Sequence, residues 1–228
     1  MDFEQVTGSF DDKVVEYLGL DKAKIEKEFG SSFGFVYYFL HPKVFHADLD
    51  FYGENAEPYH NIINGVNQLI DAGLETRVLT ARNIADIEKY EKGVVEKTHN
   101  FVNCNLKKVS EIIFVDKTQL KEAYISDTDY WIDDNYQVLL ETLLAHNVYI
   151  VKHRFPRNEH LFAHLVITDR HSPSQPFVED VLNHQKSTGK KRLTIDLDDT
   201  LVSWRGCFKE VCDYARKHYW NQLRKYLH

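Results

Sequence analysis

The chain is poor in cysteine, methionine and proline. Its 228 residues include three cysteines, one methionine and five prolines. The cysteines, Cys104, Cys207 and Cys212, are odd in number and lack the spacing of a metal site, so we expect a reducing compartment and no disulfide framework. The twelve histidines are scattered and show no zinc-site spacing.

Long apolar runs are also absent. No stretch reaches the eighteen consecutive apolar residues typical of a membrane span. The first residues, MDFEQVTGSFDDK, are polar and acidic and do not resemble a secretory signal. We therefore expect a cytoplasmic protein with no membrane partner.

An excess of positive charge is missing as well. The chain has 28 Lys and Arg against 35 Asp and Glu, giving a formal charge of −7, and its pI is about 5.9. A duplex nucleic acid binder needs a basic face to neutralise phosphates, so this composition argues against that class. A small anionic substrate is compatible with the charge if a metal ion and a lysine supply local positive potential. A hydrophobic content of 43% predicts a packed core.

Helix and strand patterns alternate from about residue 45. Expected strands cover residues 76–82, 111–117, 129–135, 148–155 and 192–197, and expected helices cover 61–73, 84–102, 136–147 and 176–185. This alternation predicts an α/β fold with a doubly wound, mostly parallel sheet over residues 45–203. Residues 1–44 read as short helices and residues 204–228 as one long helix.

Polar residues follow several of the expected strands. In a doubly wound sheet, ligands collect beyond the carboxyl ends of the strands, where the winding reverses. The residues at those ends are Thr80 with Ala81 and Arg82, Lys117, the pair Asp133 and Asp134, and Asp196 with Asp198, Asp199 and Thr200. Carboxylates this close repel one another, so the last group predicts a cation among them.

These strand ends resemble the four motifs of the haloacid dehalogenase-like phosphatase superfamily. The Asp-x-Asp-x-Thr motif matches Asp196, Asp198 and Thr200, the Thr motif matches Thr80, the Lys motif matches Lys117, and the acid pair matches Asp133 and Asp134. Within the superfamily, EIIFVDKTQLKEAYISDTDYWIDDN is similar to the 5′(3′)-deoxyribonucleotidases, although its interval from Lys117 to the acid pair is longer. Asp199 stands where relatives often have Gly.

The order of the motifs differs from that of the family, in which the Asp-x-Asp strand comes first. Here the motif strand, 192–200, follows the others, so the sequence resembles a circular permutation of the family fold. The resemblance implies that this strand inserts between the strand of Thr80 and the strand of Asp133. It also implies a small α-helical cap built from residues 1–44 and 204–228. A domain-swapped homodimer is the alternative arrangement.

The resemblance implies a role for each of these residues. Asp196 would be the nucleophile and Asp198 the acid and base, with Lys117 and Thr80 completing the catalytic set. Mg²⁺ would be held by Asp196, Asp198 and one or both of Asp133 and Asp134. The substrate would be bound by Thr80, Ala81, Arg82, Thr200 and Trp204.

Some of these residues also fit other roles. Arg82 suits either phosphate binding or a helix cap, and Trp204 suits either stacking on a nucleobase or core packing. Any single Asp-rich strand end also fits a simple turn or helix cap. The combination of motifs points to an Mg²⁺-dependent phosphohydrolase for nucleoside monophosphates. The alternatives are a sugar or other small-metabolite phosphatase, a polynucleotide 3′-phosphatase, or a catalytically silent nucleotide-binding scaffold.

Overall fold

The computed structural model describes residues 10–40, 57–80, 93–115, 118–144, 148–153, 160–167, 174–197, 200–203 and 208–228. The chain divides into two compact units. The larger comprises Glu57–Glu88 and Gly93–Ser203, and the smaller comprises Met1–Ala56, Lys89–Lys92 and Trp204–His228.

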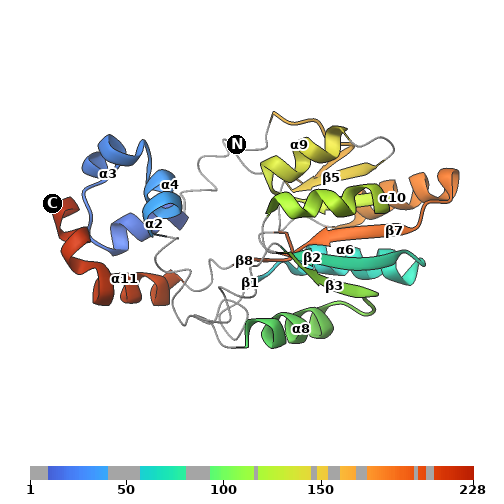
Figure 1. Cartoon of the computed structure of the whole chain (residues 1–228), viewed down its shortest axis with the longest axis horizontal. Coiled ribbons are helices and arrows are strands. Elements are labelled where there is room, and N and C mark those ends of the chain that lie inside the picture. Colours follow the sequence, from blue (N-terminus) through green and yellow to red (C-terminus); the bar gives the residue numbers. More distant parts are fainter. Residues whose placement is uncertain are drawn as a thin grey trace. The chain divides into compact units, whose positions relative to one another are not determined.

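Six parallel strands form the sheet of the larger unit (Figure 1). They are β2 (Glu75–Thr80), β3 (Glu111–Phe114), β4 (Tyr130–Asp133), β5 (Tyr149–His153), β6 (Leu165–Ile167) and β7 (Arg192–Asp196). Their order is β3-β2-β7-β4-β5-β6. Strand β7, the last of these six along the chain, therefore lies inside the sheet between β2 and β4, which confirms its expected position. The expected sheet was mostly parallel, and every pairing among these six strands is parallel.

The central strands are buried along almost their whole length. All four residues of β4 are buried, as are the last four of β7. Strands covered on both faces read as continuous apolar runs, which is why YWI and LTI were recognisable in the sequence. Asp129 ties the start of β7 to β4, because its Oδ2 accepts backbone N–H groups of Lys191 at 3.0 Å and Arg192 at 2.9 Å.

Helices cover both faces of the sheet. On one face α6 (His60–Asp71) packs against α10 (Gln175–Thr188), and on the other α9 (Tyr136–Leu144) packs against the 3₁₀ helix η2 (Thr118–Asp127). Two neighbouring residues of β4 point to opposite faces of the sheet. The Tyr130 ring contacts His184 of α10, whereas Trp131 packs with Ile125 of η2 and Val138 of α9.

Other elements of the larger unit are shorter or lie outside the sheet. Helix α8 (Val94–Asn105) precedes β3, and β1 (Glu57–Pro58) pairs antiparallel with β8 (Val202–Ser203). The sequence predicted neither this two-stranded pair nor β6, which falls in a stretch expected to be loop. Strands of two or three residues are too short to show a period-two pattern.

The smaller unit is helical in its described part. It contains α2 (Phe10–Tyr17), α3 (Lys22–Phe29), α4 (Ser32–Gly34), the π-helix η1 (Phe35–Leu40), α11 (Phe208–Leu223) and the 3₁₀ helix η5 (Arg224–Tyr226). The expectation of one long C-terminal helix was wrong: the backbone is non-helical at Tyr219, and η5 follows α11. Tyr226 packs on Phe29, Phe35 and Phe39. In the described part of both units, no helix combines the length and apolar composition needed to cross a bilayer.

Close packing of α6 on α10 depends on Gly65. A Cβ atom at this position would lie 2.3 Å from Cζ and 2.6 Å from Cε1 of Phe177, and 2.8 Å from Cβ of Ser174. Phe177 is 5% exposed and its ring is rigid, so the ring has little room to retreat.

We expect Gly65→Ala to destabilise the larger unit. Alanine gains about 1 kcal/mol of helix propensity over glycine, but overpacking against Phe177 costs about 1–3 kcal/mol. The free energy of unfolding in urea measures the balance. Asn64→Ala, at an exposed position of the same helix, is the control and should not be destabilising. The second substitution Phe177→Leu should recover part of the loss; no recovery would contradict the packing account.

Candidate functional site

Three carboxylates converge at the carboxyl ends of β4 and β7. Asp133, Asp134 and Asp196 each present an oxygen such that these atoms all lie within 4.8 Å of one another. The strand register explains the convergence. Ile132 is paired with Ile195, so the next residue on each strand, Asp133 and Asp196, lie side by side where the two strands end. Asp134 follows directly on the chain.

A buried lysine joins two of these carboxylates. Nζ of Lys121, on η2, lies 2.5 Å from Oδ1 of Asp196 and 3.2 Å from Oδ2 of Asp133. Lys121 is 2% exposed, Asp133 is fully buried and Asp196 is 4% exposed. Lysine and aspartate are almost never buried to this extent unless they are paired, so the three side chains form one ionic unit.

The electrostatics favour the charged lysine. Burial by itself would lower the pKa of Lys121, but the charges of Asp133 and Asp196 and the hydrogen bond to Asp196 raise it well above its ordinary value. Lys121 therefore stays an ammonium at neutral pH. Three aspartates and one lysine, counted at their formal charges, give the site −2, which a divalent cation would neutralise.

Asp133 has further donors besides Lys121. Its Oδ1 accepts the backbone N–H of Asn135 at 2.6 Å, and its Oδ2 accepts the Trp131 indole N–H at 3.2 Å. Asn135 in turn starts α9, because its side-chain oxygen accepts the backbone N–H of Gln137 at 3.0 Å. The turn after β4 and the Trp131 side chain thus each hold one oxygen of the Asp133 carboxylate.

The two predicted threonines are also buried. The hydroxyl of Thr200 donates to Oδ1 of Asp134 at 3.4 Å, so Thr200 contacts the acidic cluster directly. Thr80 ends β2, one residue beyond Leu79, which is paired with Asp196. Of the remaining predicted site residues, Ala81, Arg82, Lys117, Asp198 and Trp204 lie outside the described residues.

Lys121 was missed by the sequence analysis, which named Lys117. Lys121 lies twelve residues before Asp133, four residues closer than Lys117. The interval from Lys117 to the acid pair was longer than in the deoxyribonucleotidases, and this was the one signal that favoured a later lysine. The 3₁₀ helix that carries Lys121 was not predicted either.

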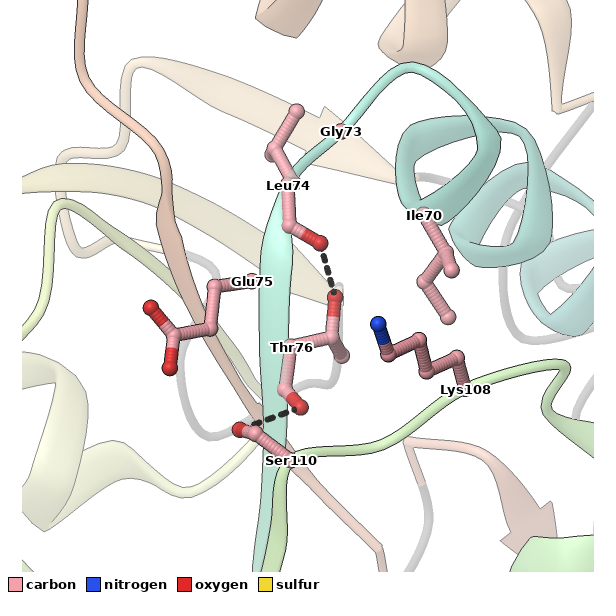
Figure 2. Close-up of a pocket in the computed structure, with 7 residues that line it drawn as sticks. All are labelled: Ile70, Gly73, Leu74, Glu75, Thr76, Lys108 and Ser110. Atoms are coloured by element: carbon pink, nitrogen blue, oxygen red, sulfur yellow. Dashed lines mark hydrogen bonds between the residues drawn. The ribbon is translucent and has the colours of Figure 1, made fainter.

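A separate cavity lies at the opposite end of β2. Figure 2 shows this cavity, of about 320 Å³, which is lined by Ile70, Gly73, Leu74, Glu75, Thr76, Lys108 and Ser110. Its hydroxyls are already bonded within the protein: Thr76 Oγ1 donates to the Leu74 carbonyl and Ser110 Oγ to the Thr76 carbonyl. The acidic cluster is at the carboxyl ends of the strands, so the two features are distinct.

Comparison with known proteins adds no family assignment, because no protein-family model matches the chain and no curated protein is significantly similar to it.

We expect Lys121→Met to destabilise the protein strongly. Removing the ammonium leaves two adjacent buried carboxylates without their positive counter-charge, which costs about 3–5 kcal/mol of unfolding free energy. Urea unfolding followed by tryptophan fluorescence measures the change. The control is Lys107→Met, which breaks the exposed pair with Asp71 and should cost at most about 1 kcal/mol. Equal losses of unfolding free energy in the two variants would contradict the claim that the buried ion pairs stabilise the protein more than an exposed pair does.

Proposed function

We propose that the protein is an Mg²⁺-dependent phosphohydrolase that uses Asp196 as its nucleophile and acts on nucleoside monophosphates. The observation that carries the proposal is the buried contact of Lys121 with Asp196 and Asp133, beside Asp134. The resemblance of DLDDT and WIDD to the phosphatase motifs supports the same reaction class.

The donor set fits a hard divalent cation. All three converging side chains offer carboxylate oxygens, which Mg²⁺ prefers, and no histidine or cysteine takes part among the described residues. Asp133, Asp134 and Asp196 would hold the ion. When bound, Mg²⁺ would offset the negative charge of the phosphoryl oxygens, so that an anionic nucleophile can approach.

Covalent catalysis then gives one role to each aspartate of the Asp-x-Asp motif, Asp196 and Asp198. A carboxylate oxygen of Asp196 attacks phosphorus, the bond from phosphorus to the ester oxygen breaks, and Asp198 gives its proton to that leaving oxygen. In the second half, Asp198 takes a proton from water. The water oxygen attacks phosphorus, which releases inorganic phosphate and restores Asp196.

Lys121 has a role in both halves of this reaction. Its ammonium holds the Asp196 carboxylate at 2.5 Å and so fixes the direction from which the nucleophile approaches. A fixed positive charge in a buried site also stabilises the negative charge that accumulates on the phosphoryl group more than it would in water. Lys121 thus supplies the function that the sequence analysis gave to Lys117.

The proposed substrate class rests on the likeness to the deoxyribonucleotidases and on the charge of the chain. A formal charge of −7 disfavours long polyanions such as a polynucleotide 3′ end. It is compatible with a small monoester, whose charge a single metal ion and a lysine can balance.

We expect the protein to release phosphate from nucleoside monophosphates with Mg²⁺ and not after treatment with a chelator. A panel of nucleoside monophosphates, sugar phosphates and a 3′-phosphorylated oligonucleotide distinguishes the substrate classes. Asp196→Asn should lower kcat by at least about 10³-fold, because it removes the nucleophile. The matched control Asp71→Asn changes an exposed carboxylate of the same unit and should keep full activity.

Two results would count against the proposal. Activity that survives in a folded Asp196→Asn protein would remove the nucleophile assignment. Turnover of sugar phosphates without any nucleotide turnover would keep the reaction but replace the substrate class.

A further inference from the structure

Lys121 stands on an unusual element. Helix η2 runs as a 3₁₀ helix over ten residues, Thr118–Asp127, whereas 3₁₀ runs longer than three or four residues are uncommon because their hydrogen bonds have poorer geometry. The carbonyl groups at the end of such a helix have no partner within it. An element of this kind needs contacts from outside to hold its shape, and with it the position of Lys121.

Arg77 of β2 supplies these contacts. Its Nη2 donates to the backbone carbonyls of Tyr124 and Asp127, each at 2.9 Å, and its Nη1 donates to Oδ2 of Asp127 at 3.1 Å. The guanidinium carbon also lies 5.6 Å from the centre of the Tyr124 ring. The Arg77 side chain is only 15% exposed, whereas the Asp127 side chain is 62% exposed, so the bond to the Tyr124 carbonyl is the better shielded from water.

The same guanidinium also binds the strand that carries Asp196. Nε of Arg77 donates to Oγ1 of Thr194 at 2.8 Å, and Thr194 lies two residues before Asp196 on β7. The Thr194 hydroxyl in turn donates a hydrogen bond to Oγ1 of Thr128, the residue directly after η2, at 2.9 Å. One planar group therefore fixes the end of η2 against β7, and these two elements bring Lys121 and Asp196 together.

We propose that Arg77 is a positioning residue, which acts through η2 to keep the Lys121 ammonium between Asp133 and Asp196. The proposal rests on the phosphohydrolase function for its effect on turnover. Loss of Arg77 releases the C-terminal end of η2 and withdraws Lys121 from the site. All three carboxylates stay in place, because they belong to β4, β7 and the turn after β4.

Loss of Arg77 should therefore change Mg²⁺ binding and turnover in a way that differs from general damage to the fold. Withdrawing a positive charge from three carboxylates strengthens their attraction for a divalent cation, so Mg²⁺ should bind equally well or more tightly. Turnover should fall nevertheless, since Asp196 loses the group that orients it. General unfolding would weaken Mg²⁺ binding and turnover together.

Charge alone does not explain the contacts of Arg77. Lysine offers a single nitrogen, which cannot reach acceptors on η2 and on Thr194 at the same time, whereas guanidinium presents five donors in a rigid plane. Arg77→Lys should therefore behave like Arg77→Met. Arg192 is the matched control, because it also bonds the Asp127 carboxylate but is 48% exposed in its side chain.

The test compares wild type, Arg77→Met, Arg77→Lys and Arg192→Met by three measurements. Amide hydrogen exchange follows residues 118–127, with β3 as an internal reference. Calorimetry measures the Kd of Mg²⁺, and the phosphate-release assay measures kcat. For both Arg77 variants we expect exchange in 118–127 to rise about tenfold or more, the Mg²⁺ Kd to stay within about twofold or fall, and kcat to fall about 10- to 100-fold. Arg192→Met should resemble wild type.

Unchanged exchange in 118–127 in the Arg77 variants would overturn the inference, and so would Mg²⁺ binding that weakens in parallel with kcat. Failure of the proposed function looks different, because wild type would then release no phosphate from any ester while the exchange difference persisted. Arg77→Lys keeps the positive charge at this position, so it still allows the comparison if Arg77→Met does not fold.

Discussion

The ion pairs from Lys121 to Asp133 and Asp196 are the constraint on which the candidate site depends. They join the ends of two paired strands, β4 and β7, to the 3₁₀ helix η2. Removing two carboxylates and an ammonium from water is unfavourable, and their mutual attraction offsets this only when the geometry is good. Burial of all three side chains therefore demands a rigid surrounding, which Asn135, Trp131 and Arg77 provide by hydrogen bonds.

The position of β7 in the sheet creates this constraint. Strand β7 is the last of the six sheet strands along the chain, yet it pairs with β2 on one side and β4 on the other, and this places Asp196 beside Asp133. A strand at the centre of a parallel sheet is buried on both faces, so a charge at its end needs a partner within the protein or a bound cation. Lys121 satisfies part of that need. The remaining formal charge is the physical basis for proposing Mg²⁺.

Much of the sheet and the three carboxylates of the candidate site could be predicted from the sequence. The apolar runs of β4 and β7 are evident, and the carboxyl ends of parallel strands meet at one edge, so Asp133, Asp134 and Asp196 could be grouped before any coordinates. Lys121 could not. Its helix has three residues per turn and no amphipathic pattern of period 3.6, and its place is set by Arg77 and by Ile125 packing on Trp131. These are tertiary contacts that local patterns do not encode. The three-residue β6 was missed because so short a strand has no detectable periodicity.

A double-mutant cycle between Lys121 and Asp196 tests the central claim most directly. The unfolding free energies of wild type, Lys121→Met, Asp196→Asn and the double variant give the coupling between the two side chains, free of their separate effects. If the ammonium and the carboxylate form one buried ionic unit, we expect a coupling of about 2 kcal/mol or more, with the double variant more stable than the sum of the single losses implies. Losses that add to within about 0.5 kcal/mol would contradict the account.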